Sequence, residues 1–394
     1  MTNLPQGWKW KSLGEICFIT DGTHKTPNYI ETGIPFLSVK NISKGFFDLS
    51  DVKYISLEEH NKLIKRAKPE FGDILICRIG TLGKAIKISL EFEFSIFVSL
   101  GLLKPKVKII SDYLVYFLNS CFIEEWINDN KVGGGTHTAK LNLNILEKCP
   151  IALPPLKEQE RIVGILDESF AKIDESIKIL EQNLLNLDEL MQSALQKAFN
   201  PLKDNAKENY KLPQSWEWKS LEEISENISA GGDKPKNCTE SKTAKNQIPV
   251  YANGVNNNGL VGYTDKATII KPSLTISARG TIGFVCIRKE PYFPIVRLIS
   301  LIPCENILCL HYLYFCLNFF IAKGEGSSIP QLTIPKFKSL QIPLPPLKEQ
   351  EQIAKHLDEL SSHVKNLKQN YQAQIKDLQE LKNSLLDKAF KGNL

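Results

Sequence analysis

The sequence predicts an α+β protein: two mixed α/β domains joined by two long antiparallel coiled-coil helices, with the two halves forming a pseudo-two-fold internal repeat. Three observations lead to this fold class. Two border sequences each occur twice, and two long stretches carry the apolar spacing of a coiled coil. The segments between them hold short strand-like runs separated by glycine, asparagine and proline.

The repeated borders divide the chain into two halves. LPQGWKWKSLGEI at 4–16 returns as LPQSWEWKSLEEI at 212–224 with ten identities in thirteen positions. LPPLKEQERIVGILDE at 153–168 returns as LPPLKEQEQIAKHLDE at 344–359 with twelve in sixteen, whereas the contents between the borders differ by 17 residues in length and hardly align. We therefore expect five segments: a globular segment at 1–152, a helix at 153–200, a linker at 201–211, a second globular segment at 212–343 and a second helix at 344–394.

Each PPLKEQE sequence is expected to begin a long helix, because proline suits the first helical turn. The apolar residues that follow are spaced alternately by three and four, which is typical of a coiled-coil seam. The helices are expected to end near Pro201 and Gly392, so each has some 44 residues and a length of about 65 Å. The predicted seam residues are Leu166, Ile173, Ile177, Leu180, Leu184 and Leu187 in the first helix, and Leu357, Leu360, Val364, Leu367, Leu378 and Leu385 in the second.

Chain connectivity decides how these helices pair. With parallel helices, the twelve residues at 200–211 would have to return along a whole helix, but they span at most about 43 Å when fully extended. Antiparallel helices need no such return, since the first helix would leave one globular segment and arrive at the other. The sequence therefore predicts a rod with a globular segment at each end, related by an approximate two-fold axis.

The globular segments carry more strand signals than helix signals. Runs such as IPFLSVKNI, DILICRIG, SLTISARG and FVCIRK are short and rich in β-branched or aromatic residues. One helical stretch stands out in each segment, at 111–127 and at 309–322. Both segments are therefore expected to be mixed α/β domains.

The net charge of the 394 residues is only +5, but the charge is unevenly distributed. Residues 5–150 hold 19 Lys and Arg against 16 Asp and Glu, and residues 212–343 hold 14 against 10. The remainder, chiefly the predicted helices, has a net charge of −2. Two basic domains held apart on a rigid rod are typical of a two-site reader of a polyanion, although a mild basic excess is also common on an ordinary solvated surface.

Several classes of function and location are disfavoured. No apolar run reaches about 18 residues and the first residues lack a signal-peptide layout, so we expect a cytoplasmic protein without a membrane segment. The nine cysteines are scattered and the six histidines do not cluster, so neither disulfides nor a metal site is expected. The chain has no Walker A loop, no G-x-S-x-G, no H-E-x-x-H and no N-P-P-[YF] or D-P-P-[YF] of an adenine methyltransferase. We therefore expect no catalytic residues, no cofactor and no enzymatic activity of the chain alone.

Taken together, the motifs resemble those of the DNA-specificity subunit of a Type I restriction-modification system, over essentially the whole chain. The resemblance rests on three paired motifs. They are the L-P-x-x-W borders at Leu4 and Leu212, the P-L-K-E-Q-E helix entries at Pro155 and Pro346, and R-x-G-T-x-G at 78–83 matched by R-G-T-I-G at 279–283.

This resemblance implies a DNA-binding subunit that is not itself catalytic. The segments 1–152 and 212–343 would be target recognition domains 1 and 2, each reading one half of a bipartite, asymmetric double-stranded DNA sequence. The helices would fix the distance between the halves, at most about 19 base pairs for a rod of about 65 Å, and would bind two adenine methyltransferase (modification) subunits. Restriction subunits with nuclease and translocase activity would complete the assembly.

Two alternatives remain open. One is a specificity subunit whose partner is a fused methyltransferase-nuclease. Separate neighbouring reading frames for a methyltransferase and a translocase would argue against it. The other is a coiled-coil scaffold with no nucleic-acid role, and the basic globular segments argue against that.

Candidate DNA-binding residues lie beside a glycine-rich turn in each half. Arg78 and Arg279 stand at strand ends, where a guanidinium can bind two acceptors of a guanine or a phosphate, or can pair with a carboxylate inside its own domain. Thr81 and Thr281 can offer a hydroxyl to phosphate, or can simply belong to a structural turn. Lys84 follows the first of these turns.

Further candidates lie in loops. His24 and Lys25 in DGTHKTP, and Lys234 and Lys236 in GGDKPK, occupy matching early loops that are either DNA contacts or plain solvated loops. Asn can pair bidentately with adenine but is also a common turn former. On this basis the other loop candidates are Thr136, His137, Lys140, Asn256, Asn257 and Asn258. The border tryptophans Trp8, Trp10, Trp216 and Trp218 are instead expected to pack the domains on the helices.

Overall fold

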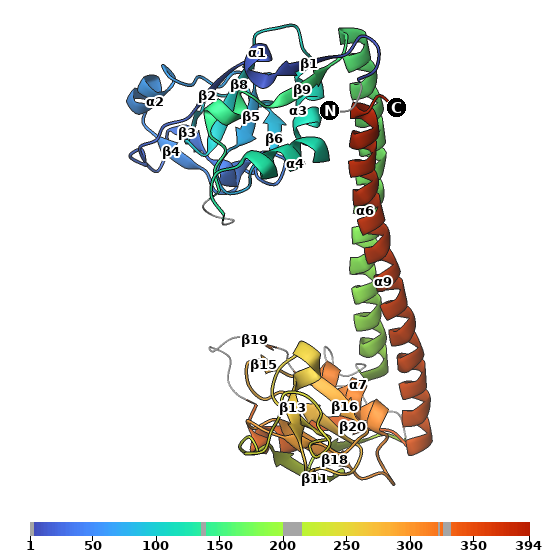
Figure 1. The fold of residues 1–394 in the computed structure, drawn as a ribbon. Coiled ribbons are helices and arrows are strands. Elements are labelled where there is room, and N and C mark those ends of the chain that lie inside the picture. Colours follow the sequence, from blue (N-terminus) through green and yellow to red (C-terminus); the bar gives the residue numbers. More distant parts are fainter. Residues whose placement is uncertain (1–3, 135–138, 200–214, 322–323, 326–331) are drawn as a thin grey trace. The chain divides into compact units, whose positions relative to one another are not determined.

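The computed structural model describes residues 4–134, 139–199, 215–321, 324–325 and 332–394. The chain forms two compact units (Figure 1). Unit 1 comprises Met1–Leu180 and Ala373–Leu394, and unit 2 comprises Glu181–Gln372. Each unit therefore combines one globular part with segments of both long helices. The predicted linker at 201–211 lies outside the described residues.

Unit 1 is built on a four-stranded antiparallel sheet. Its strand order is β2 (Cys17–Asp21), β8 (Leu100–Pro105), β5 (Ile74–Cys77) and β6 (Ala85–Lys87). A second sheet has the order β4 (Lys53–Ile55), β3 (Ile34–Leu37) and β7 (Ser95–Ile96), and β1 (Lys9–Ser12) pairs with β9 (Pro150–Leu153). The helices of the globular part are α1 (Leu13–Ile16), η1 (Val39–Asn41), α2 (Leu57–Leu63), α3 (Ser111–Leu118), α4 (Cys121–Asn130) and α5 (Leu143–Leu146).

Unit 2 repeats this topology. Its four-stranded sheet has the order β11 (Ser225–Ala230), β18 (Ile299–Pro303), β14 (Ser273–Ile276) and β16 (Val285–Arg288). Its second sheet has the order β13 (Leu260–Thr264), β12 (Ile248–Tyr251) and β17 (Phe293–Pro294). The two-stranded pairs are β10 (Glu217–Ser220) with β20 (Gln341–Leu344) and β15 (Thr281–Ile282) with β19 (Gly324–Glu325), and the helices are η2 (Asn256–Gly259), α7 (Leu310–Phe320) and α8 (Ile334–Lys338).

The equivalent sheets pack against equivalent helices. In Figure 1, α3 lies beside the four-stranded sheet of unit 1, and α7 lies beside its counterpart in unit 2. The helix expected over 111–127 is in fact two helices, α3 and α4. The buried Ser120 separates them by donating from Oγ to the Phe117 carbonyl at 2.7 Å, while the Asn119 amide bonds the backbone of Ala85.

A glycine joins the two sheets at the same place in each unit. A Cβ at Gly22 would lie 2.0 Å from the carbonyl oxygen of Ile96, and one at Gly231 would lie 2.6 Å from the nitrogen of Ile295. No side chain fits such a close approach of two backbones. The repeated glycine therefore marks equivalent positions in the two units.

The two long helices are α6 (Leu156–Phe199) and α9 (Leu347–Phe390), which agree closely with the expected ranges. The repeated PPLKEQE sequence has a clear structural role at their starts. Gln159 and Gln350 are fully buried, and each donates to a proline carbonyl just before its helix, at 2.9 and 2.8 Å. The side-chain oxygen of each glutamine also accepts a hydrogen bond of 2.9 Å from a backbone N–H. The donor is Ile110, the N-cap residue of α3, or Cys309, the N-cap residue of α7. The motif thus fastens each long helix to the globular part of its unit.

The helices run antiparallel within each unit. In unit 1, Asp174 of α6 pairs with Lys382 of α9, and Ile162 packs in one core with Phe390. In unit 2, Asp188 pairs with Lys368, and Phe199 packs in one core with Leu357. In both units, α6 residues with higher numbers contact α9 residues with lower numbers. The antiparallel pairing is therefore confirmed.

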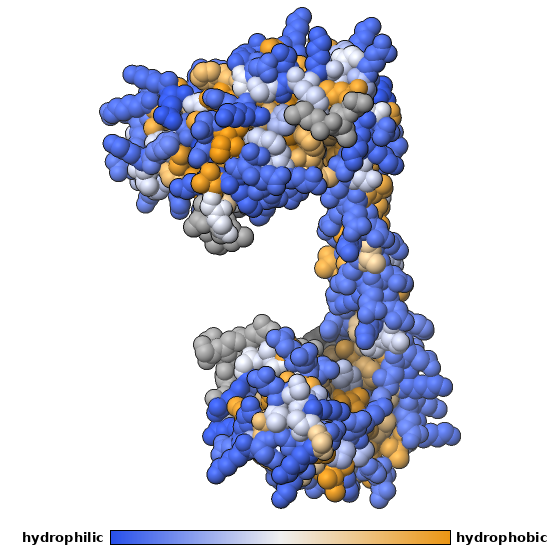
Figure 2. Space-filling model, in the orientation of Figure 1, coloured by the Kyte–Doolittle hydropathy of each residue, from blue (hydrophilic) through white to orange (hydrophobic). Residues whose placement is uncertain are grey.

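All but one of the predicted seam residues are buried or half-buried. Leu166, Ile173, Leu187, Leu357 and Val364 are buried. Ile177, Leu180, Leu184, Leu360, Leu378 and Leu385 are half-buried. Leu367 is an exception, because it is 39% exposed and the neighbouring Lys368 makes the contact with α6. Figure 2 shows mostly hydrophilic side chains on the visible faces of the helices, with isolated apolar ones among them.

The border tryptophans contact the long helices or the helices beside them. Trp8 belongs to the core of unit 1 that includes Leu166 of α6. The indole nitrogen of Trp216 donates to Oε1 of Glu349 in α9 at 3.1 Å. These contacts explain why the LPQxWxW sequence recurs together with the PPLKEQE sequence.

Candidate nucleic-acid interface

The glycine-rich turns after β5 and β14 have the same geometry. Gly80 and Gly83 have φ values of 81° and 81°, and Gly280 and Gly283 have 70° and 80°, so each turn needs glycine at both places. The Gly83 N–H donates to the Cys77 carbonyl at 2.9 Å, as the Gly283 N–H does to that of Ser277 at 3.0 Å. Each residue of the first turn is therefore equivalent to the residue of the second turn whose number is higher by 200.

This equivalence corrects the expected match of the two arginines. β5 pairs Ile76 with Ala85, and β14 pairs Ile276 with Val285, which aligns Arg78 with Ala278 and Ile79 with Arg279. The Leu141 N–H bonds the Arg78 carbonyl and the Leu332 N–H bonds that of Ala278, which gives the same alignment. R-x-G-T-x-G and R-G-T-x-G differ by one residue before the first glycine. The two arginines therefore occupy adjacent, non-equivalent positions.

Arg78 is a structural residue, so the expectation of an exposed guanidinium is wrong for it. The side chain is buried and forms an ion pair with Asp21, which is only 1% exposed, while Nε donates to the Leu141 carbonyl at 2.9 Å. The second alternative considered above, pairing with a carboxylate inside the domain, is the one found. A Cβ at Gly101 would lie 3.0 Å from Cδ of Arg78, so glycine leaves room for the arginine to cross β8.

Three side chains, those of Arg78, Arg66 and His24, surround the carboxylate of Asp21. Besides Arg78, it pairs with Arg66, and its Oδ2 lies 3.2 Å from Nε2 of His24. Burial raises the pKa of Asp21, but the hydrogen bonds and charges of Arg66 and Arg78 outweigh it and hold the pKa below its ordinary value. The carboxylate is therefore ionised at neutral pH, and it holds His24 at the surface.

His24 and Lys25 border a basic hollow on unit 1. Both are exposed, and they line a cavity of about 450 Å³ together with Lys62 and Arg66. Lys62 pairs with Glu58, but Lys25 forms no ion pair among the described residues. The hollow concentrates positive charge, as a phosphate-binding surface does. The sequence singles out His24 and Lys25 as candidates, but not Arg66, which belongs to no recognisable motif.

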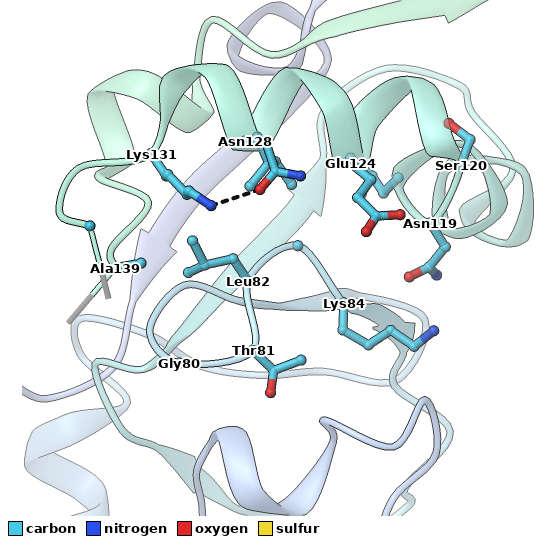
Figure 3. Close-up of a pocket in the computed structure, with 14 residues that line it drawn as sticks. Gly80, Thr81, Leu82, Lys84, Asn119, Ser120, Glu124, Asn128, Lys131 and Ala139 are labelled. Atoms are coloured by element: carbon cyan, nitrogen blue, oxygen red, sulfur yellow. Dashed lines mark hydrogen bonds between the residues drawn. The ribbon is translucent and has the colours of Figure 1, made fainter. Parts of the chain in front are cut away.

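A second cavity in unit 1 collects the turn candidates (Figure 3). It measures about 420 Å³ and is lined by Thr81 and Lys84 of the turn and by Glu124, Asn128 and Lys131 of α4 or its end. Nζ of Lys131 donates to Oδ1 of Asn128 at 2.8 Å. In Figure 3, Thr81 and Lys84 lie on the turn opposite α4. The cavity offers mixed polar groups of both charges, so its lining does not select an anion.

Of the other candidates of unit 1, the structure describes only Lys140. Lys140 is exposed and forms a backbone ladder with Val132, with N–H to carbonyl distances of 2.8 and 2.9 Å. Thr136 and His137 lie outside the described residues.

The loop candidates of unit 2 are exposed. Lys234 and Lys236 follow β11 in the loop equivalent to that of His24. Asn256, Asn257 and Asn258 form the turn η2, and Asn257 and Asn258 have φ values of 46° and 53°, which fits their role as turn formers. Their exposure leaves the side chains free to contact a ligand. The buried Arg288 donates to the Asn258 carbonyl and lies over the Tyr251 ring at 3.5 Å, so it supports this turn.

Unit 2 lacks the buried ion pair of unit 1. The pairings of β2 and β11 with their neighbours align Asp21 with Ala230 and Gly101 with Ile299, while Arg78 corresponds to Ala278. All three unit 2 residues line a cavity of about 400 Å³, together with Arg279 and Arg297. Thr281, two residues after Arg279, has a buried hydroxyl without a partner among the described residues.

The exchange of Asp21 and Arg78 for two alanines was visible in the sequence, but only when the halves are aligned by register. A carboxylate and an arginine that disappear together between two halves indicate contact. An alignment of the two arginine motifs with each other hides this signal.

Among the described residues, no helix combines the length and the apolar character needed to cross a membrane. In the same residues, no three His, Cys, Asp or Glu side chains gather in a group that would hold a metal ion.

Comparison with known proteins identifies the family. The model of the Type I restriction modification DNA specificity domain matches twice, at residues 5–185 and 213–377. The chain belongs to this family. The two matches cover the two halves of the repeat and most of the chain.

Individual specificity subunits are similar over most of their length. A putative type I specificity subunit of Mycoplasma pneumoniae, S.MpnORF507P, is 31% identical over 274 residues, which is 68% of this chain and 69% of that protein. The StySPI specificity subunit of Salmonella potsdam is 24% identical over 433 aligned residues, covering 99% of this chain and 90% of that protein.

Two solved structures share the fold. A chain from a structure of the type I restriction-modification system, described for its assembly and conformational transition, matches with a TM-score of 0.83, 22% identity and full coverage of both chains. The HsdS subunit of Thermoanaerobacter tengcongensis matches with a TM-score of 0.61 and 22% identity, over 100% of this chain and 99% of that one. The predicted fold class is therefore confirmed.

Proposed function

We propose that this chain is the DNA sequence-recognition subunit of a Type I restriction-modification complex. In this proposal each globular domain reads one half of a bipartite, asymmetric double-stranded DNA target in the cytoplasm. The long helices set the spacing of the halves and dock two adenine methyltransferase subunits, and restriction-translocase subunits join the assembly. The chain itself catalyses no reaction, and methyl transfer belongs to the partner.

The proposal rests on the observation that the two units share one fold but differ in their surfaces. The units share strand order, turn geometry and helix attachment, yet the residues beside the equivalent turns differ in charge and hydrogen bonding. Arg66 and His24 gather around Asp21 in unit 1, whereas Ala230 stands at that position in unit 2. Two domains with different surfaces bind different DNA sequences, which is what an asymmetric target requires.

The positive hollows support DNA as the ligand. The cavity bordered by His24, Lys25, Lys62 and Arg66 and the cavity bordered by Arg279 and Arg297 both concentrate basic side chains. Lysine and arginine facing a phosphate release counterions and dominate the affinity for nucleic acid. These surfaces disfavour the alternative of a scaffold without a nucleic-acid role.

An apolar groove supports the docking of a partner on the helices. In unit 2, a cavity of about 570 Å³ lies between α6 and α9 and is lined mostly by apolar groups, including Leu190, Ala194, Ile353 and Leu360. Leu190 is 48% exposed. An apolar groove between two helices is suited to a helix of a second protein. The methyltransferase is the partner that the family resemblance implies for this surface.

Adenine methylation tests the proposed function directly. The chain and its methyltransferase are expressed in a host that lacks both, and methylated adenines are mapped over the whole genome. We expect one new bipartite, asymmetric sequence to be methylated only when both proteins are present. The methyltransferase alone serves as the control, and an unchanged adenine pattern with both proteins would contradict the proposal.

Exchange of one domain tests the division of labour. Residues 212–343 are replaced by the corresponding segment of another family member, so that both repeated borders remain intact. One half of the methylated sequence should change while the other half and the spacer are retained. Retention of the complete original sequence would show that the domains are not independent readers.

A further inference from the structure

The arginines of the chain divide into two groups according to their partners. Arg66 and Arg78 pair with Asp21, Arg161 pairs with Glu158, and Arg288 bonds Thr275 and the Asn258 carbonyl. Arg279 and Arg297 have no side-chain hydrogen bond or ion pair within the described part of the chain, and Nε of Arg279 is buried without a partner. These two arginines line the same cavity in unit 2.

The cavity is positively charged and open to solvent. Its other lining residues are Ala230, Gly231, Ala278, Ile299, Leu332, Thr333 and Ile334, so no carboxylate balances the two guanidinium groups. Arg297 and Ala230 are exposed, and Arg279 is half-buried. A buried guanidinium nitrogen without an acceptor is unfavourable, because it has lost water and gained no replacement. The lining of this cavity is therefore suited to an anion.

Unit 1 indicates what that anion replaces. At the equivalent place in unit 1, the carboxylate of Asp21 lies inside the domain and neutralises Arg78. In unit 2 the carboxylate is exchanged for Ala230, and the arginines stand at the positions equivalent to Ile79 and Ser99. An internal anion in one domain is thus matched by an open cationic cavity in the other.

The backbone that positions Arg297 is strained. Val296 and Arg297 have φ values of 52° and 60°, and two successive non-glycine residues, one of them β-branched, seldom adopt this region. Their N–H groups donate to the carbonyls of Gly232 and Gly231, both at 2.8 Å. These bonds fix the strained segment beside β11, where the side chain of Arg297 borders the cavity.

We propose that the cavity bordered by Arg279 and Arg297 binds a phosphate group of the DNA backbone and thereby positions unit 2 on its half of the target. This inference rests on the proposed function. A guanidinium fork matches a phosphate oxygen pair, and two arginines suit one phosphodiester. A base-reading arginine has to protrude into the major groove, whereas Arg279 is recessed and its Nε is covered. The contact is therefore independent of base sequence.

Binding measurements on the chain with its methyltransferase test the phosphate contact. Fluorescence anisotropy is recorded for a target duplex and for a non-target duplex of equal length, at several salt concentrations. Arg279→Gln and Arg297→Gln should each weaken binding to both duplexes by a similar factor, about tenfold for a charged hydrogen bond. The double variant should reduce the slope of log affinity against log salt by about 0.9, as expected for one lost phosphate contact.

Two further variants make the result specific. Lys289→Gln removes a charge from an exposed lysine of the same unit and should change the affinity less than twofold. Ala230→Asp supplies the carboxylate of unit 1 at the exposed edge of the cavity and should weaken DNA binding as the arginine variants do. Circular dichroism and thermal melting confirm that each variant is folded.

Three outcomes would overturn the inference. The first is that the arginine variants have the affinities and salt slopes of the wild type. The second is that they lose affinity only for the target duplex, which would reassign Arg279 to base reading. The third is that Lys289→Gln loses as much affinity as the arginine variants. The methylation map of the wild type separates this failure from that of the proposed function. If the wild type directs methylation to a bipartite sequence while the variants bind DNA normally, only the phosphate site is refuted.

Discussion

The buried pair of Asp21 and Arg78 leads to a prediction about stability. Asp21→Asn keeps the size of the side chain but removes the charge that neutralises Arg78. Arg78 is 7% exposed and Asp21 1%, so water cannot replace the lost interaction. A buried charge whose partner is removed costs about 3–5 kcal/mol of stability. Arg66 contributes little to this figure, because its side chain is 55% exposed and well screened.

In unit 2 the three positions equivalent to Asp21, Arg78 and Gly101 hold the uncharged residues Ala230, Ala278 and Ile299. The combined variant Asp21→Ala, Arg78→Ala and Gly101→Ile copies the residues of unit 2, and removal of Arg78 clears the space that a Cβ at position 101 needs. Replacing a buried ion pair by apolar residues of suitable volume is often neutral or stabilising. We therefore expect the triple variant to lie within about 1.5 kcal/mol of the wild type, far above the single variant.

Hydrogen exchange of the full chain measures this difference locally. Amides of β2, β5 and β8 should exchange faster in Asp21→Asn by a factor that corresponds to about 3–5 kcal/mol, while amides of unit 2 serve as the internal control. A single variant that costs less than about 1 kcal/mol, or a triple variant that costs as much as the single one, would refute the reasoning.

The pH dependence follows from the lowered pKa of Asp21. A carboxyl group whose pKa falls on folding stabilises the protein above its unfolded pKa of about 3.9. That contribution is lost as the pH falls through the folded pKa. Urea unfolding of the wild type and of Asp21→Asn should therefore differ most at neutral pH and converge in acid.

Three further predictions concern unit 1. Phe390→Ala should cost about 3–5 kcal/mol, because this buried ring contacts Phe117 at 4.9 Å between centroids, and it should speed hydrogen exchange in the last turns of α9. Gly101→Ile alone should destabilise the unit by about 1–3 kcal/mol in urea unfolding, because its Cβ would meet Arg78. Cys121 should react slowly with iodoacetamide at pH 8, since burial and its hydrogen bond to Asp387 raise the pKa of the thiol to about 11, and Asp387→Asn should speed that reaction.

The architecture was predictable because its signals are local and duplicated. The PPLKEQE and LPQxWxW sequences each join a globular part to a long helix, through Gln159 and Gln350 and through Trp216. A sequence with such a role recurs wherever the junction recurs. The antiparallel direction followed from linker length alone. Leu367 was misjudged because a heptad pattern does not show where a long lysine such as Lys368 takes over the contact.

The candidate site was predictable only in part, because its contacts link residues distant in sequence. Arg78 and Asp21 are 57 residues apart, and no local pattern shows that they meet. The equivalence of Arg279 with Ile79 depends on a strand register that differs by one residue from the apparent motif match. Arg297 carries no motif, and its importance follows from the backbone conformation and the shared cavity. The exposed candidates His24, Lys25, Lys234 and Lys236 stay predictions.

Unit 1 is built from two chain segments that are far apart in the sequence, and this affects its folding during protein synthesis. Its core contains Leu386, Ala389 and Phe390, which follow Tyr113 and Phe117 by some 270 residues. A ribosome that has translated as far as Phe199 has released every strand of this unit but none of the α9 residues that cover its aromatic side chains. The nascent chain must therefore keep an apolar surface exposed while the whole of unit 2 is translated. We therefore expect unit 1 to be prone to aggregation during that interval, because its last structural part is translated after unit 2.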